Sequence, residues 1–171
     1  MLPKLVDPRR LAEQRAVYSE EMAVSDLPRV ADFVESGAKK VQIDLSFDRD
    51  EQYRIRVTGS IQGSVNLVCQ RCMDLVETRF QQDMDLMVVR NDEQSKSVPR
   101  DIDPWEVGET ANLHELVEDE IFLALPVVAR HEVGECEAPP IPDSGVVVEQ
   151  EEDRQPPFEI LKDLTKSSDE N

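Results

Sequence analysis

The feature that most constrains the fold is an alternation of apolar and polar residues between residues 40 and 90. Four segments show this alternation, namely VQIDLSFD, YRIRV, SVNLVC and FQQDMDLMVV. Successive side chains of a β-strand point to opposite faces of a sheet, so each segment predicts a strand with one buried face. The connections between the segments are too short for parallel crossovers. We therefore expect an antiparallel meander of four strands, with Tyr53 among the inward-facing residues.

Helix signals flank the alternating region on both sides. Asp7 followed by proline predicts a helix over residues 8–16, and SDLPRVADFVESG predicts a second short helix. Residues 17–24 fit either an extended segment or one face of a helix. After the meander, NDEQSKSVPRDIDPWEVGET reads as a loop anchored by Trp105, and NLHELVEDEIFLAL predicts a helix capped by Asn112. The expected fold class is α+β, an antiparallel sheet with flanking helices.

The second half of the chain is strongly acidic. Of the net charge of −18, most lies in residues 91–171, which carry 22 Asp and Glu against 6 Lys and Arg. We expect residues 1–140 to form a single α+β domain, residues 141–155 an acidic linker and residues 156–171 a C-terminal anchoring peptide. The acidic C-terminal tail is expected to be partly disordered, because it has few residues that can build a core.

Several classes of function are excluded by what the sequence lacks. No run approaches the roughly 18 apolar residues of a membrane helix, and the first residues lack the apolar run of a signal peptide, so we expect a cytoplasmic protein. The glycines are scattered, and no serine or second histidine stands with His114 in an arrangement that suggests nucleophilic catalysis. The acidic run at residues 118–120 reads as a solvated helix face, because consecutive helix positions diverge. We expect neither an enzyme nor a small-molecule substrate.

The three cysteines are the strongest chemical signal. Cys69 and Cys72 form a Cys-x-x-Cys pair at the turn between two predicted strands, and with His131 and Cys136 they would complete a set of four zinc ligands. The 63 residues between Cys72 and Cys136 exceed the ~15 to 20 of a zinc ribbon. Free cysteines packed in a core remain an alternative. A redox dithiol is less favoured, because no helix N-terminus follows the pair.

A contact with RNA is a further candidate. Arg54 and Arg56 face away from the apolar side of their predicted strand and would form a small basic stripe, and Arg71 lies between the paired cysteines. Acidic residues intermingle with them, and the aromatic residues of a single-strand binder are absent. Any direct contact is therefore expected to be small.

Three segments resemble the YceD family of large ribosomal RNA subunit accumulation proteins. They are LVCQRCMDLVETRF, LVEDEIFLALPVVARHEVGEC and PPFEILKDL, in that order. The resemblance implies a non-enzymatic ribosome biogenesis factor that supports accumulation and processing of large-subunit (23S) ribosomal RNA. Its expected partners are assembly or RNA-processing proteins, with the RNA contacted directly or indirectly.

The resemblance also bears on individual residues. The four cysteine and histidine positions match a recurring pattern of the family, and Phe158 matches the aromatic residue of its C-terminal anchor, with Leu161 beside it. A function from another class stays open, that of a thiol- or zinc-handling protein in which the cysteines themselves do the work.

Overall fold

A computed structural model of the chain describes residues 1–35, 39–132 and 134–136. The predicted acidic linker and the anchoring peptide, with Phe158 and Leu161, lie outside the described residues. None of the helices in the described part is both long and apolar enough to cross a membrane.

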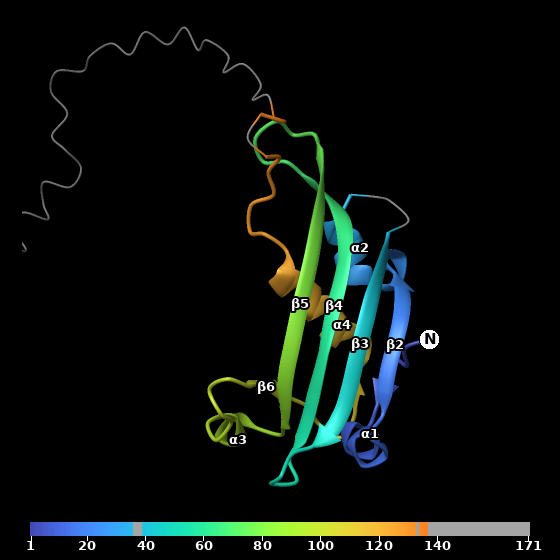
Figure 1. The fold of residues 1–171 in the computed structure, drawn as a ribbon, viewed down its shortest axis with the longest axis vertical. Coiled ribbons are helices and arrows are strands. Elements are labelled where there is room, and N and C mark those ends of the chain that lie inside the picture. Colours follow the sequence, from blue (N-terminus) through green and yellow to red (C-terminus); the bar gives the residue numbers. More distant parts are fainter. Residues whose placement is uncertain (36–38, 133, 137–171) are drawn as a thin grey trace, which may run out of the picture. The chain divides into compact units, whose positions relative to one another are not determined.

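The described residues form an α+β fold around a five-stranded sheet of order β2-β3-β4-β5-β6 (Figure 1). The first four strands pair antiparallel, and β6 pairs parallel to β5. A separate two-stranded pair joins β1 to β7. The strands are β1 Leu5–Val6, β2 Val17–Ala23, β3 Lys40–Arg49, β4 Ile55–Val68, β5 Leu75–Val89, β6 Asp103–Glu106 and β7 Ala111–Asn112.

The alternation of apolar and polar residues correctly predicts the sheet, but it places one strand boundary wrongly. The second and third predicted strands are one continuous strand, β4, which spans 14 residues. Gly59 reads as a break in the sequence, but it lies in mid-strand opposite Leu45, where a Cβ atom would overlap the carbonyl oxygen of Asp44. Glycine therefore lets β3 approach β4 closely instead of ending the strand. Tyr53 is not inward-facing either, because it lies in the β3–β4 turn with 78% of its surface exposed.

Two segments without a clear strand pattern in the sequence also contain strands. Residues 17–24 form β2 almost throughout. The polar segment after the meander contains a short helix, α3 (Asp92–Ser95), and the strand β6. A strand of four residues that includes Pro104 has no alternation to detect, and its place at the sheet edge tolerates the proline. Trp105 in this strand packs against the core, as expected of an anchor.

Helices α1 (Pro8–Gln14) and α4 (Leu113–Ala124) begin where their capping residues predict, whereas α2 (Pro28–Phe33) begins after Leu27 without a cap from that residue's side chain. Helix α1 follows Asp7, whose side chain accepts a hydrogen bond from the Arg9 N–H. Helix α2 follows a short 3₁₀ turn, η1 (Val24–Asp26). Helix α4 starts after Asn112, whose side chain accepts from the N–H groups of the first turn. These caps satisfy donors that a helix leaves unpaired.

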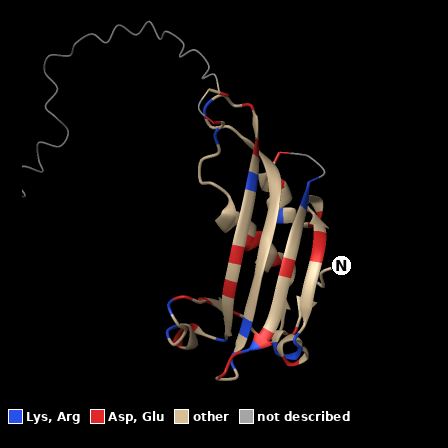
Figure 2. Ribbon diagram, viewed as in Figure 1, with Lys and Arg blue, Asp and Glu red and all other residues tan. Residues whose placement is uncertain are grey.

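The core lies between one face of the sheet and the helices. Every inward side chain of β3, from Val41 to Phe47, is at most 1% exposed, and Leu113, Val117 and Ile121 of α4 are fully buried in the same cluster. Each such side chain contributes roughly 1.5 to 3 kcal/mol by leaving water. The side chains of β3 that alternate with these are polar or charged, and Figure 2 shows charged residues along the strands of the sheet. The long hairpin of β4 and β5 extends from this core and carries the cysteine pair at its tip.

The acidic run of α4 is not a solvated face, contrary to expectation. Glu118 is 2% exposed, and its Oε1 accepts a hydrogen bond of 2.8 Å from the backbone N–H of Arg29 in α2. Glu120 is 6% exposed on the other side, where burial raises its pKa. Only Asp119 is exposed, and it pairs with the Arg29 guanidinium at 2.6 Å. Adjacent residues of a helix point their side chains in different directions. Because α4 packs against neighbours on two sides, a carboxylate on each of these sides becomes buried.

Candidate metal centre

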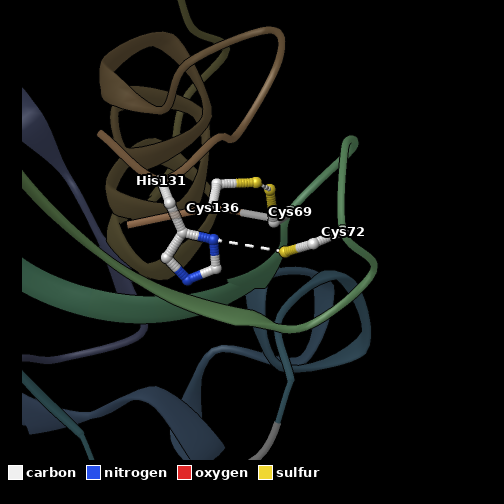
Figure 3. Close-up of side chains that lie close together, drawn as sticks. All are labelled: Cys69, Cys72, His131 and Cys136. Atoms are coloured by element: carbon white, nitrogen blue, oxygen red, sulfur yellow. Dashed lines mark hydrogen bonds between the residues drawn. The ribbon is translucent and has the colours of Figure 1, made fainter. Parts of the chain in front are cut away.

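A tight turn at the tip of the β4–β5 hairpin presents the cysteine pair. The Cys69 N–H donates to the carbonyl oxygen of Asp74 at 2.8 Å, and the Met73 N–H donates to the carbonyl oxygen of Cys69 at 3.0 Å. Met73 has a φ of 66°, a left-handed conformation that closes the turn in so few residues. The turn places the side chains of Cys69 and Cys72 on the same side of the hairpin (Figure 3).

The segment after α4 supplies the other two side chains. Proline at position 126 follows the helix, and the chain then runs back along the hairpin tip. The backbone N–H of Gln70 in the turn donates to the carbonyl oxygen of Ala129 at 2.9 Å, which ties the two segments together. His131 and Cys136 follow within a few residues and point toward the cysteine pair (Figure 3). The structure therefore brings together side chains that lie 59 to 67 residues apart in the chain.

The spacing of the four side chains suits a tetrahedral metal ion. Their ligand atoms all lie within 4.8 Å of one another. Cys69 Sγ is 3.7 Å from Cys136 Sγ, and Cys72 Sγ is 3.4 Å from His131 Nδ1. Zinc–sulfur bonds of about 2.3 Å and zinc–nitrogen bonds of about 2.0 Å give a sulfur–sulfur edge of about 3.8 Å and a sulfur–nitrogen edge of about 3.5 Å in a tetrahedron. The three cysteines are free, so the short sulfur contact is not a disulfide.

A second hydrogen bond orients the histidine. Its Nε2 lies 3.0 Å from the carbonyl oxygen of Leu75. Since a carbonyl oxygen only accepts, Nε2 carries a hydrogen, and in the neutral ring the lone pair then lies on Nδ1, which faces the sulfur atoms. Metal-bound histidines commonly donate their other N–H to a backbone carbonyl in this way. The donor set and its outer contacts fit a metal ion.

The three thiols differ in their environment. The backbone N–H of Cys72 is the largest cause that holds the pKa of Cys69 down to about 5, with further support from the N–H groups of His131 and Arg71. Burial raises the pKa of Cys136 to about 11, and the neighbouring sulfur atoms act in the same direction. The Cys69 thiol raises the pKa of His131. The cluster thus stabilises a first thiolate and opposes a further one unless a positive charge is present.

The basic residues considered for RNA contact are in different surroundings. Arg54 pairs with Asp50 at 2.6 Å, and Arg56 pairs with Asp85 through two hydrogen bonds. Each guanidinium is thus offset by a carboxylate, so the two residues do not make a stripe of uncompensated charge. Arg71 is exposed on the turn between the cysteines.

Sequence reasoning missed the backbone groups that support the cluster. The carbonyl oxygens of Leu75 and Ala129 orient His131 and fasten the turn, but a backbone carbonyl leaves no signal in residue identity. Only the left-handed residue of a tight Cys-x-x-Cys turn offers a cue, and glycine would be the expected residue there instead of Met73.

Comparison with known proteins identifies relatives along nearly the whole chain. The family model described as "Large ribosomal RNA subunit accumulation protein YceD" matches residues 57–165. A protein of Haemophilus influenzae with the same description is 32% identical over 166 residues, which cover 95% of each chain. No solved structure matches the chain.

Proposed function

The chain belongs to the family of large ribosomal RNA subunit accumulation proteins called YceD, and from this premise we propose that it is a non-enzymatic factor in assembly of the large ribosomal subunit. The observation that carries the proposal is the relative of the same description, aligned along 95% of both chains. The protein would act in the cytoplasm and raise the yield of mature large-subunit ribosomal RNA without transforming a substrate itself.

The cysteine–histidine cluster takes the part of a structural zinc centre in this proposal. Cys69, Cys72, Cys136 and His131 would hold the ion, and all four positions are then filled by protein, as in zinc sites that support a fold. The ion would supply the positive charge that several thiolates need. The residues themselves would fasten the segment after α4 to the hairpin tip, which the backbone hydrogen bond from Gln70 to Ala129 already joins to it.

Protein partners suit the charge of the molecule better than bare RNA. A net charge of −18 opposes approach to a phosphate backbone. Proteins that assemble on or process ribosomal RNA are commonly basic, and an acidic surface attracts them. The factor would therefore work mainly through protein contacts, with large-subunit RNA as a secondary partner.

The C-terminal anchoring peptide, residues 156–171, is a proposed protein contact. Phe158 and Leu161 belong to an apolar cluster beyond an acidic segment. Burial of each large apolar side chain contributes roughly 1.5 to 3 kcal/mol, so such a peptide gains by docking. Deletion of residues 156–171 should weaken either the stability of the chain or its association with assembly proteins. A truncated chain unchanged in both respects would remove the peptide from the proposal.

Depletion of the protein in growing cells tests the function directly. The expected result is a fall in mature large-subunit RNA relative to small-subunit RNA, measured by electrophoresis of total RNA and restored by the intact gene. The purified protein should leave precursor RNA uncut. An unchanged ratio of the two RNAs after complete depletion would contradict the proposal.

The alternative, a thiol- or zinc-handling protein, rests on the close approach of Cys69 and Cys136 sulfur atoms at 3.7 Å. Zinc exchange and thiol oxidation separate the two functions. Zinc that exchanges slowly, with thiols that stay unreactive in the zinc-bound protein, fits a structural centre. Rapid zinc transfer to a chelator, or a reversible disulfide, fits the handling function.

A further inference from the structure

A second candidate site lies at the opposite end of β4 from the cysteine cluster. A cavity of about 520 Å³ opens where α1, the β3–β4 turn and the end of β5 meet. Four arginines line it: Arg9 comes from α1, Arg49 and Arg54 flank the β3–β4 turn, and Arg90 follows β5. Figure 2 shows basic residues at this end of the sheet, with acidic residues among them. Glu109 is the one carboxylate among the described residues that line the cavity.

The four arginines fall into two pairs. Arg49 and Arg54 are held in place, since Arg49 donates to the carbonyl oxygen of Tyr53 at 2.9 Å and to Glu13 at 3.1 Å, while Arg54 pairs with Asp50. Arg9 and Arg90 are exposed, and within the described part of the chain no carboxylate forms an ion pair with either. Two guanidinium groups are thus available for an anionic ligand, beside two that are already positioned.

An aromatic ring stands at the same cavity in a costly backbone conformation. Tyr53 has a φ of 62°, a left-handed value that favours glycine or asparagine, and its side chain is largely exposed. The turn is closed by hydrogen bonds between Asp50 and residues 53 and 54, at 2.9 and 3.0 Å, which glycine would allow equally well. Tyr53 thus has a strained backbone, while its side chain makes little contact with the rest of the chain. This combination points to a role for the side chain in binding a ligand.

The walls of the cavity add an apolar surface. Ile55, Met87 and Val107 line it beside the arginines, and all three are less than a tenth exposed. A volume of about 520 Å³ falls within the ~300 to 1,000 Å³ of ligand sites. The site therefore combines guanidinium groups for phosphate, a free aromatic ring for stacking and an apolar wall for the face of a base.

We propose that this cavity binds a short single-stranded segment of RNA, with Arg9 and Arg90 on its phosphates and Tyr53 stacked on a base. The inference rests on the proposed function, which supplies large-subunit RNA as the ligand. An acidic peptide would share the arginines, but it has no planar group that requires an exposed tyrosine ring. Stacking on aromatic residues is how proteins commonly recognise unpaired RNA bases.

The acidity of the chain limits this contact without preventing it. Only a few phosphates meet the arginines, while the acidic second half repels the rest of the backbone. The complex is therefore weak and local, and it complements a protein partner instead of replacing one. Such a site would select unpaired RNA on an assembling particle, because a double helix offers no free base to Tyr53.

Charge-matched double variants of the full chain test the phosphate contacts. The probe is a labelled single-stranded RNA of about 8 nucleotides, and binding is followed by fluorescence anisotropy across a range of salt concentrations. Arg9→Gln with Arg90→Gln should weaken binding about tenfold and lower the slope of log affinity against log salt by about 1 to 1.5. Arg10→Gln with Arg100→Gln removes the same charge from residues that do not line the cavity, and should leave the slope unchanged.

A matched pair of glycine variants tests the stacking contact. Tyr53→Gly should weaken RNA binding about tenfold while the melting temperature stays unchanged or rises, because glycine accepts the left-handed conformation. Met73→Gly makes the same backbone change at the other end of β4 and should not alter RNA binding. An RNA that lacks bases at its central positions should bind the parent chain and Tyr53→Gly equally.

Three outcomes would overturn the inference. They are equal loss of RNA affinity in the two arginine pairs, unchanged affinity in Tyr53→Gly, and binding of an acidic peptide at this cavity without binding of the RNA. Failure of the proposed function looks different. If depletion leaves large-subunit RNA unchanged, the function fails whatever the cavity binds, whereas full rescue by Arg9→Gln with Arg90→Gln, together with parental RNA binding, rejects the cavity alone.

Discussion

At one end of β4 the chain turns through Tyr53, and at the other it turns through Met73, with φ values of 62° and 66°. The first turn is held by Asp50, whose carboxylate accepts from the N–H groups of residues 52 and 54 and from the Arg54 guanidinium. The second turn has backbone hydrogen bonds and the cysteine cluster. Two turns of one backbone conformation thus depend on different side-chain chemistry, hydrogen bonds at one end and metal ligands at the other.

The difference indicates why the two ends suit different tasks. The turn at Asp50 is complete with protein groups alone, which leaves the side chain of Tyr53 available for a ligand beside Arg9 and Arg90. The turn at the cysteines brings sulfur and nitrogen atoms together and, in our proposal, needs an ion to hold them. In these proposals the end at Tyr53 would bind RNA, and the end at the cysteines would stabilise the fold.

Removal of a cysteine ligand should produce the largest effect. Cys72→Ser should abolish zinc binding and lower the free energy of unfolding by about 4 kcal/mol or more, because a structural metal contributes its binding energy to the fold. Thermal unfolding with and without a chelator measures this loss. In chelated protein the same substitution should change stability by less than about 1 kcal/mol. Equal losses in both states would show that the cysteine matters only as a packed side chain.

A change at Asp50 should have a smaller effect, confined to the other end. Asp50→Ala removes the acceptor of three hydrogen bonds and should cost about 2 kcal/mol in chemical denaturation. Zinc content should not change. Asp50→Asn keeps one acceptor oxygen and should cost about half as much. If Asp50→Ala also released zinc, the two ends could not be treated as independent.

Glu118 lies between the two ends and offers a test of the region that they share. Glu118→Leu leaves the Arg29 N–H at the start of α2 without its acceptor and should cost about 1 to 2 kcal/mol. Glu118→Gln keeps an acceptor and should cost less. Hydrogen exchange should show a loss of protection in α2, with protection unchanged in the turn at Asp50 and in the turn at the cysteines. A loss of protection at the cysteine turn instead would break the division between the two ends.

The smallest expected effect is a dependence of stability on acid pH. Burial acts to raise the pKa of Asp50, but hydrogen bonds from Arg54 outweigh it and leave that pKa below its usual value. The carboxylate therefore contributes stability above the pKa of the unfolded chain, about 3.9, and the contribution is lost as pH falls through the lower folded value. Asp50→Asn should lose less stability than the parent in acid titrations of metal-free protein. Identical acid profiles would contradict the assignment.

The parts of the fold that follow local rules could be predicted from the sequence. Caps at Asp7 and Asn112 and the buried face of β3 depend on neighbouring residues alone. The continuity of β4 could not be read, because Gly59 signals a break unless the approach of Asp44 is known. The burial of Glu118 could not be predicted either, because its partner, the backbone N–H of Arg29, lies 89 residues away in the chain.

The two candidate sites show the same contrast. The cysteine cluster could be proposed from the sequence because three cysteines allow few combinations, although their distance in the chain is unusual. The arginine cavity could not be predicted, because its arginines come from three segments and nothing in one segment indicates that the others lie beside it. Arg54 and Arg56 suggested a stripe by their spacing, but Arg54 pairs with the nearby Asp50 and Arg56 pairs with Asp85 of β5.

The metal content of the intact chain is the most direct test of this account. The protein should be purified from cells without chelator and examined by elemental analysis, with Cys136→Ser treated alongside it. The account predicts about one zinc ion per chain, its loss in the variant, and a lower melting temperature after chelation. A metal-free protein whose thermal stability is unchanged by chelator would contradict it.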